Sequence, residues 1–155
     1  MRAGRIIAAL LVASCAVMPA QATAQTGANA AAATRPDLGP TDFVNAALQV
    51  VAAVDRYEMG SVWDRASAVM KNSVARDAFV ASTAQRRAAL GAVRSRDWTT
   101  VARVVVTQAG GPLPPGQYLT VRLTSMGDSG RRMEEVISFH LDGDGQWRLA
   151  GYGLQ

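Results

Sequence analysis

The hydrophobic pattern of this chain changes its period once, near Val93, and that change limits the fold more than any other feature. Before Val93, apolar residues recur every three or four positions, which is typical of amphipathic helices. After Val93 they alternate with polar residues between short glycine-rich segments, which is typical of antiparallel strands joined by tight loops. Helices followed by a strand meander predict an α+β domain.

The first helix is expected to begin at Thr41. Thr41 precedes Asp42, so the pair supplies an N-cap hydroxyl and an acidic side chain in the first turn. The apolar residues that follow recur at spacings of four and three, as one face of a helix requires. This predicted stripe consists of Phe43, Ala47, Val50, Val54 and Tyr57.

Two further helices are expected before the strands begin. The second spans residues 60–71 and carries Trp63 beside an inward face of Val62, Ala66, Val69 and Met70. The third spans residues 74–90, with Ser73 as its cap and Gly91 as its end. Its predicted face is weaker because it includes an arginine, and it consists of Phe79, Thr83, Arg86 and Leu90.

Four strands are expected near residues 97–107, 117–125, 132–141 and 146–154. Alternation places one apolar set on a single face, provided that a bulge in the last turn keeps the parity: Leu119, Val121, Leu123, Ile137, Phe139, Leu141, Trp147 and Leu149. The other face is polar: Arg103, Thr120, Arg122, Thr124, Glu134, Ser138, His140 and Arg148. A sheet with one apolar face predicts that all three helices cover a single side.

Residues 1–24 have the layout of a secretory signal peptide. Arg2 and Arg5 precede an apolar run over residues 6–17, and the small residues that follow predict cleavage after Ala24. The run is shorter than the roughly twenty residues that span a bilayer. We therefore expect a periplasmic or secreted protein.

Cys15 leaves a second destination open. Residues 12–15 loosely fit the box that bacterial lipoprotein signal peptidase recognises, and cleavage there would leave a lipid-anchored protein. Apolar residues continue past Cys15, however, and a better small-residue site follows them, so ordinary cleavage is the favoured prediction. Membrane attachment is expected only if Cys15 is lipidated.

Removal of residues 1–24 changes what the composition implies. Two arginines and the single cysteine are lost, so the net charge falls from +4 to +2 and one histidine remains. A multi-histidine or cysteine-based metal centre is excluded, and we expect no metal and no cofactor. No basic run exceeds two residues, which speaks against nucleic acid as a partner.

Residues 25–40 lack periodicity and predict a flexible linker, which leaves one domain over residues 41–155.

A series of short motifs follows in a distinctive order from Tyr57 onward. They are Tyr57 with Trp63, Val74 with Phe79, residues 87–91 (Arg-Ala-Ala-Leu-Gly), residues 94–96 (Arg-Ser-Arg), residues 113–118 (Leu-Pro-Pro-Gly-Gln-Tyr), Glu135, and residues 144–152 (Asp-Gly-Gln-Trp-Arg-Leu-Ala-Gly-Tyr). In this order the chain resembles the domain-of-unknown-function 4019 family of small exported bacterial proteins. It departs from the family near Phe79, where a tryptophan is expected. The resemblance implies export and a cystatin-like or nuclear-transport-factor-2-like cone, in which helices pack on a curved sheet, and it implies no catalytic residue.

His140 is the one side chain whose ordinary pKa lies near neutrality. As a general base with Asp142 or Glu134, it would suit a pocket enzyme. Strand parity instead places it on the polar face beside a turn, and we favour a solvated histidine there. Residues 142–145 (Asp-Gly-Asp-Gly) begin like a calcium loop but lack the closing glutamate, so a hairpin turn is expected.

Arg87 and Arg96 are the leading candidates for ligand binding, together with Trp63 and Trp98. A guanidinium on a covering helix or at a strand entrance can hold an anionic ligand through its planar fork. The favoured alternative is structural. Each arginine would then pack on a tryptophan and pair with a carboxylate such as Glu135, whose charge needs a partner if it is buried.

These observations predict a non-catalytic domain that binds a protein or small ligand in the cell envelope. Two alternatives stay open: a pocket enzyme of the isomerase, dehydratase or hydrolase kind, and a lipid-anchored envelope structural protein. An enclosed cavity joining a titratable residue to Arg87 or Arg96 would favour the enzyme. An interior filled by large apolar side chains would count against it.

Overall fold

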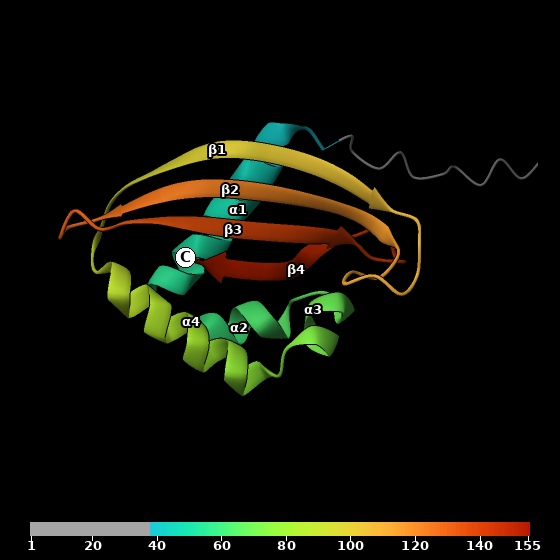
Figure 1. The fold of residues 1–155 in the computed structure, drawn as a ribbon, viewed down its shortest axis with the longest axis horizontal. Helices are drawn as coiled ribbons and strands as arrows, with labels where there is room; N and C mark the ends of the chain where they lie inside the picture. Colours follow the sequence, from blue (N-terminus) through green and yellow to red (C-terminus); the bar gives the residue numbers. More distant parts are fainter. Residues whose placement is uncertain (1–37) are drawn as a thin grey trace, which may run out of the picture. The chain divides into compact units, whose positions relative to one another are not determined.

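A four-stranded sheet and four helices make up residues 38–155, the part of the chain that the computed structural model describes (Figure 1). The elements are α1 (Pro40–Asp55), α2 (Met59–Asp64), α3 (Ala68–Ser73), α4 (Arg76–Leu90), β1 (Val93–Val106), β2 (Gly116–Gly127), β3 (Arg132–Leu141) and β4 (Trp147–Leu154). The strands pair antiparallel in the order β1-β2-β3-β4. The mixed helix and sheet class and the four-stranded antiparallel meander are confirmed. The predicted signal peptide, Cys15 and most of the linker lie outside the described residues.

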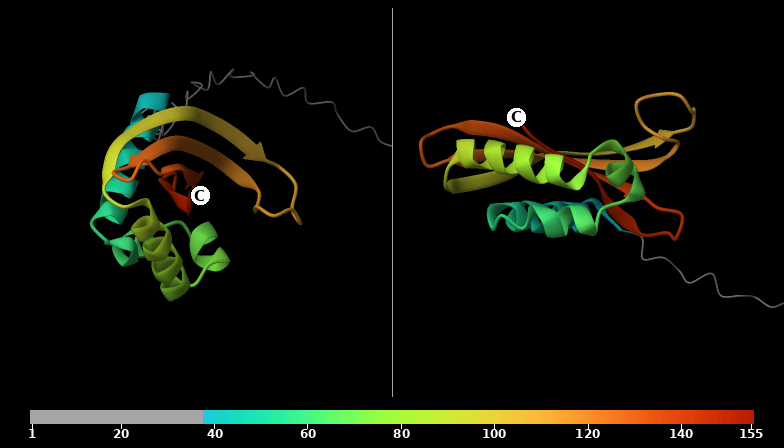
Figure 2. Two further views of the ribbon diagram at one scale, coloured as in Figure 1. Left: turned by 60° about the vertical axis from the view of Figure 1, so that its left-hand side comes forward. Right: turned by 90° about the horizontal axis from the view of Figure 1, so that it is seen from below.

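The sheet is curved, and the helices lie against its concave face (Figure 2). Apolar side chains from that face and from the helices form one core over residues 38–155. Its strand members include Leu119, Val121, Leu123, Ile137, Phe139 and Leu149, as the alternation predicts. Within residues 38–155, no helix is long and apolar enough to cross a bilayer.

α1 begins one residue before the predicted N-cap. Gly39 is the N-cap, and Pro40 is the first helical residue, a position where its missing N–H costs nothing. The Gly39 N–H donates to Asp42 Oδ2 over 2.9 Å, and the Asp42 N–H donates to the Gly39 carbonyl over 3.1 Å. The prediction of Thr41 as the cap is wrong, whereas the acidic residue in the first turn is confirmed.

α1 ends at Asp55, before the last residue of the predicted stripe. The Tyr57 N–H donates to the Val54 carbonyl and the Glu58 N–H donates to the Ala53 carbonyl, each over 2.9 Å. This pair of bonds is a Schellman motif, with Tyr57 at the left-handed position that glycine usually occupies, at φ +58°. Tyr57 is therefore exposed rather than part of the inward stripe.

The predicted second helix is two short helices, α2 and α3, and the predicted three-helix arrangement is corrected to four. Ser67 separates them. Its N–H donates to the Leu149 carbonyl of β4 over 2.9 Å, and its hydroxyl accepts from the Val69 N–H over 3.2 Å, which caps α3. The helix is broken because the Ser67 backbone bonds to the sheet instead of continuing the helical pattern.

α4 begins at Arg76 and ends, as predicted, before Gly91, which has φ +78°. Ser73 is the last residue of α3 and not the cap of α4. The buried face of α4 consists of Phe79, Thr83, Arg87 and Leu90. The arginine on this face is therefore Arg87, and the prediction of Arg86 is wrong because Arg86 is exposed.

The last hairpin contains the bulge that strand parity requires. The Asp142 N–H donates to the Gln146 carbonyl over 2.9 Å, and Gly145 has φ +79°, as in a three-residue hairpin loop with a bulge. Leu149 therefore opposes Phe139 on the apolar face. A further register shift opposite residues 138 and 139 brings Tyr152 onto that face, opposite Ile137.

Candidate functional site

Two arginines and two carboxylates meet under the sheet in a cluster that we call the core network. Arg87 Nε donates to Asp55 Oδ1 over 2.7 Å. Arg96 donates to both oxygens of Asp55, over 2.9 and 3.2 Å, and its Nε donates to Glu135 Oε1 over 2.8 Å. Asp55 thus bridges the two guanidiniums, and the Glu135 side chain is only 1% exposed.

Two hydroxyl groups complete the core network. The Ser125 hydroxyl donates to Glu135 Oε1 and accepts from Arg96 Nε over 3.0 Å. The Tyr152 hydroxyl donates to Glu135 Oε2 over 2.6 Å. With Asp55 on α1 and Arg87 on α4, these residues bring together two helices and all four strands.

Strand register explains why the strand members of the core network meet. Arg96 is directly opposite Ser125 on β2. Glu135 is opposite Leu123, and Tyr152 is opposite Ile137, so Ser125 and Tyr152 are diagonal neighbours of Glu135 on the same face. The parity of the strands therefore places one buried polar row within an otherwise apolar face.

Opposite charges in the core network shift the pKa values of Asp55 and Arg96. Burial would raise the pKa of Asp55, but the hydrogen bonds and charges of Arg96 and Arg87 outweigh it and hold the pKa below its usual range. Burial would lower the pKa of Arg96, but Asp55 and Glu135 outweigh it and raise the pKa. Burial and the charge of Glu135 raise the pKa of Tyr152, so its hydroxyl remains a donor at neutral pH.

The structure brings Arg87 and Arg96 together, as partners of a shared carboxylate. The predicted pairing of Arg96 with Glu135 is confirmed. Trp63 lies elsewhere: its Nε1 donates to the Val74 carbonyl over 3.0 Å. Trp98 is 60% exposed on β1. Two positive and two negative groups compensate one another without an anionic ligand, and the ligand-binding role of these four residues stays a prediction.

His140 belongs to a second polar cluster, at the opposite end of β3 from Glu135. Its Nδ1 lies 2.7 Å from Asp142 Oδ1, and its side chain is 13% exposed, so it is less solvated than predicted. The Ser67 hydroxyl donates to the same Asp142 oxygen over 2.6 Å. The carboxylate therefore lies between the serine and the histidine, whereas a nucleophilic triad needs the histidine between the other two.

The loop over residues 142–145 is the hairpin turn that we expected. Arg148 donates to Asp142 over 3.0 Å and to both oxygens of Asp144, over 2.9 and 2.7 Å. The Arg148 hydrogen bonds lower the pKa of Asp144 to about 2. Its carboxylate oxygens face a guanidinium, and residues 38–155 contain no cluster of three potential metal-ligating side chains.

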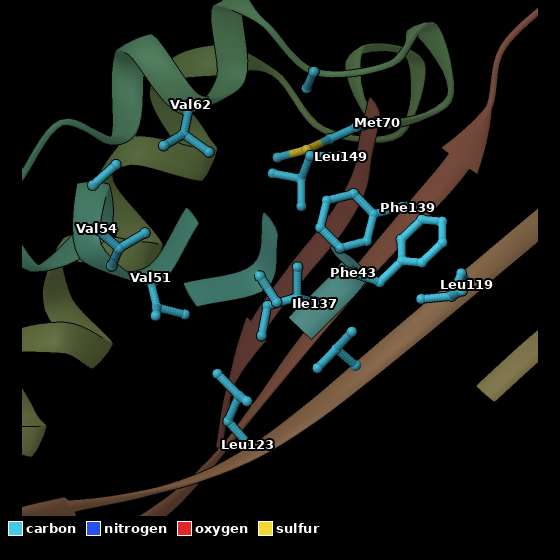
Figure 3. Close-up of a cluster of buried hydrophobic side chains, with 14 of the residues drawn as sticks. Phe43, Val51, Val54, Val62, Met70, Leu119, Leu123, Ile137, Phe139 and Leu149 are labelled. Carbon is cyan, nitrogen blue, oxygen red and sulfur yellow. The ribbon is translucent and has the colours of Figure 1, made fainter. Parts of the chain in front are cut away.

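Large apolar side chains fill the space between the helices and the sheet (Figure 3). The rings of Phe43 and Phe139 lie 6.0 Å apart, and Phe43 meets Trp147 edge to face at 5.0 Å. Leu119, Ile137 and other core members surround the phenylalanines. The core network lies beside this packed interior, and four grooves on the surface of residues 38–155 are open to solvent.

Two surface features were not predicted from the sequence. Three of the six large apolar side chains that are exposed in residues 38–155 lie on β1: Trp98, Val104 and Val105. An open groove of about 420 Å³ also runs between α4 and the free edge of β4. The run of three valines near the end of β1 was a signal for the first feature, since a strand partner on one side only leaves apolar residues uncovered.

The fold and the core network define a small helix-on-sheet domain whose buried charges pair with one another. The chain belongs to the family described as protein of unknown function (DUF4019), which matches residues 46–152. This range contains every residue of the core network, and it confirms the resemblance seen in the sequence. No curated protein and no solved structure matches the chain.

Proposed function

We propose that this chain is an exported, non-catalytic binding domain of the cell envelope, built on a cystatin-like or nuclear-transport-factor-2-like cone, and that its partner is a polypeptide. The exposed apolar side chains of β1 carry the proposal. Trp98 is 60% exposed, Val104 53% and Val105 61%. By strand register, Trp98 and Val105 lie on one face of β1 and Val104 lies on the other. Exposed apolar side chains at the edge of a sheet are typical of a surface that another protein covers.

The interior supports a polypeptide over a small ligand. A small-molecule site is usually a cleft that encloses most of its ligand. Here the two phenylalanines Phe43 and Phe139 occupy the space that a cone would offer, and the core network needs no added charge. Of the groups considered for catalysis, Glu134 pairs with Arg122 and not with His140. His140 does bond to Asp142, as a general base would, but neither residue lines any of the grooves described above.

Crosslinking in the native host tests the polypeptide partner. A photoreactive phenylalanine analogue in place of Val105 is expected to give a covalent adduct with a second polypeptide. The matched control places the same analogue at Tyr57, between α1 and α2, which is 59% exposed, and no such adduct is expected there. Equal adducts at both positions, or none at Val105, would overturn the proposal.

The mass of the exported protein tests the proposed destination. Cleavage after Ala24 would leave a soluble chain that begins at Gln25 in the periplasm or the medium. A lipid adduct on Cys15 would show an anchored protein, and an uncleaved chain in the cytoplasm would contradict export. This measurement is independent of the crosslinking result.

A further inference from the structure

β4 is an edge of the sheet, and part of its outer edge has no hydrogen-bonding partner among residues 38–155. Gln155 donates its N–H to the Glu134 carbonyl and accepts from the Glu134 N–H, so its backbone groups face β3. In an antiparallel pair every second residue directs its N–H and carbonyl away from the partner strand, and on β4 these residues are Leu154 and Tyr152. The Leu154 carbonyl points outward and accepts from Arg86 Nη1 over 2.9 Å. By the same alternation, the N–H of Leu154 and both backbone groups of Tyr152 face away from β3.

Two contacts mark the ends of this free edge. At one end the Leu149 carbonyl accepts from the Ser67 N–H, and at the other the Leu154 carbonyl accepts from Arg86. The open stretch, residues 150–154, covers roughly 17 Å at the rise of a strand. That length matches an added strand of about five residues.

The groove beside this edge has room for such a strand. α4 forms one wall through Phe79, Thr83 and Arg86, and Met70 and Val74 lie beside them. Residues 150–154 of β4 line the other side, and the groove has a volume of about 420 Å³. The groove thus offers backbone donors and acceptors along one side and a mostly apolar wall along the other.

Charge indicates what the added strand carries. Arg86 is the single charged side chain among the residues that line the groove. It uses Nη1 to bind the Leu154 carbonyl, and its side chain is otherwise exposed. An acidic side chain of a bound strand would meet the remaining N–H groups of this guanidinium.

We infer that the groove between α4 and β4 binds an extended, acidic peptide segment of a partner by adding it as a fifth strand at the edge of β4. Main-chain hydrogen bonds to Tyr152 and Leu154 would supply the binding, and Arg86 would select an acidic residue. This inference rests on the proposed polypeptide-binding function and names a site for it on the edge opposite to β1.

Amide hydrogen exchange of the mature chain tests the inference with a defined probe. The probe is a pool of capped pentapeptides with glutamate at the centre and valine, threonine or alanine elsewhere. We expect this pool to slow exchange at the Tyr152 and Leu154 amides, because both would gain a carbonyl partner. A pool with lysine at the centre should need at least a tenfold higher concentration for the same protection.

A charge reversal distinguishes selective binding of the acidic peptide from nonspecific peptide binding. Arg86→Glu should reverse the preference between the glutamate and lysine pools. Arg94→Glu makes the same change on an exposed residue of β1, outside the groove, and should leave the preference unchanged. The native amide spectrum of each variant confirms that it is folded.

Three outcomes would overturn the inference. In the first, the exchange rates of the Tyr152 and Leu154 amides do not change when the glutamate pool is added at millimolar concentration. In the second, the glutamate and lysine pools slow exchange equally. In the third, the two amides are already protected from exchange without any peptide. The Val105 crosslink is measured on the other edge of the sheet. An adduct there together with a negative exchange result would reject the groove and keep the proposed function.

Discussion

Glu135 is the residue on which the core network depends most, because its carboxylate accepts from Arg96, Ser125 and Tyr152 while its side chain is almost completely buried. A buried charge is tolerated when it is paired and hydrogen-bonded. Glu134, the adjacent residue, points to the other face and pairs with Arg122 where both side chains are about 40% exposed. Two adjacent glutamates thus each pair with an arginine, one in the buried core network and one on the exposed face.

Glu135→Gln should therefore destabilise the protein by about 3 kcal/mol, because it leaves the positive charge of Arg96 partly uncompensated in a buried site. Glu134→Gln makes the same change on the exposed face and should cost much less. Urea unfolding at pH 7 measures both. Equal losses for the two variants would show that the core network contributes no more than a surface ion pair.

Asp55 makes the stability of the protein sensitive to acid. Its pKa is lower in the folded chain than in the unfolded chain, so the unfolded state binds more protons in acid. The free energy of unfolding should be steady near neutral pH and fall as the pH drops below about 4, through the folded pKa of Asp55. Asp55→Asn should be less stable at pH 7 and lose less on acidification.

Urea unfolding between pH 7 and pH 3 provides the measurement, with Asp77→Asn as the control. Asp77 is almost fully exposed, so its replacement should leave the acid profile of the wild type unchanged. Parallel acid profiles for Asp55→Asn and the wild type would contradict the role given to Asp55.

At the level of elements, patterns that repeat along the chain were sufficient for the sheet. The period-two alternation of β2 and β3 predicted their buried face because each strand has one side against the helices. The hairpin bulge followed from the same parity. The sequence could not show the break at Ser67, because the groups that cause it, on Leu149 and Asp142, are more than seventy residues away.

The residues of the candidate site were also predictable only in part from the sequence. Arg87, Arg96 and Glu135 were identified from the sequence, and the pairing of Arg96 with Glu135 was anticipated. Asp55 was missed, although its spacing of four from Val51 places it on the buried face of α1. The spacing could not decide which of two adjacent arginines faces the core. Arg86 and Arg87 lie three and four residues after Thr83, and both spacings fit one helix face.

Ser67 offers a test of how far a contact with the sheet determines the helices. Ser67→Ala removes the α3 cap and a donor to Asp142, while the Leu149 bond to its backbone remains. We expect a loss of about 1–2 kcal/mol, mostly from the cap and from the lost hydrogen bond to Asp142. Ser73→Ala, at the other end of α3, should change stability by less than about 0.5 kcal/mol because Ser73 is exposed. Thermal or urea unfolding compares the two, and similar losses would exclude a special role for Ser67.

On the scale of the whole molecule, the core network joins parts that the chain order separates. Asp55 ends α1, Arg87 lies in the last turn of α4, and Glu135 lies on β3, one of the two inner strands of the sheet. The apolar core spans the same layers. Helices and sheet that share both a core and a buried ionic cluster have no obvious boundary at which one part could unfold alone.

Unfolding of residues 38–155 should accordingly be a single transition in which helices and strands are lost together. Trp63 on α2 and Trp147 on β4 supply separate probes. In a Trp98→Phe, Trp147→Phe variant the fluorescence of Trp63 reports on the helices, and in a Trp98→Phe, Trp63→Phe variant Trp147 reports on the sheet. Within each variant, fluorescence and far-ultraviolet circular dichroism should give the same urea midpoint. A Trp63 transition that precedes the loss of strand signal would show that the helices unfold as an independent unit, and the core network would then be a local clamp rather than the link between the two layers.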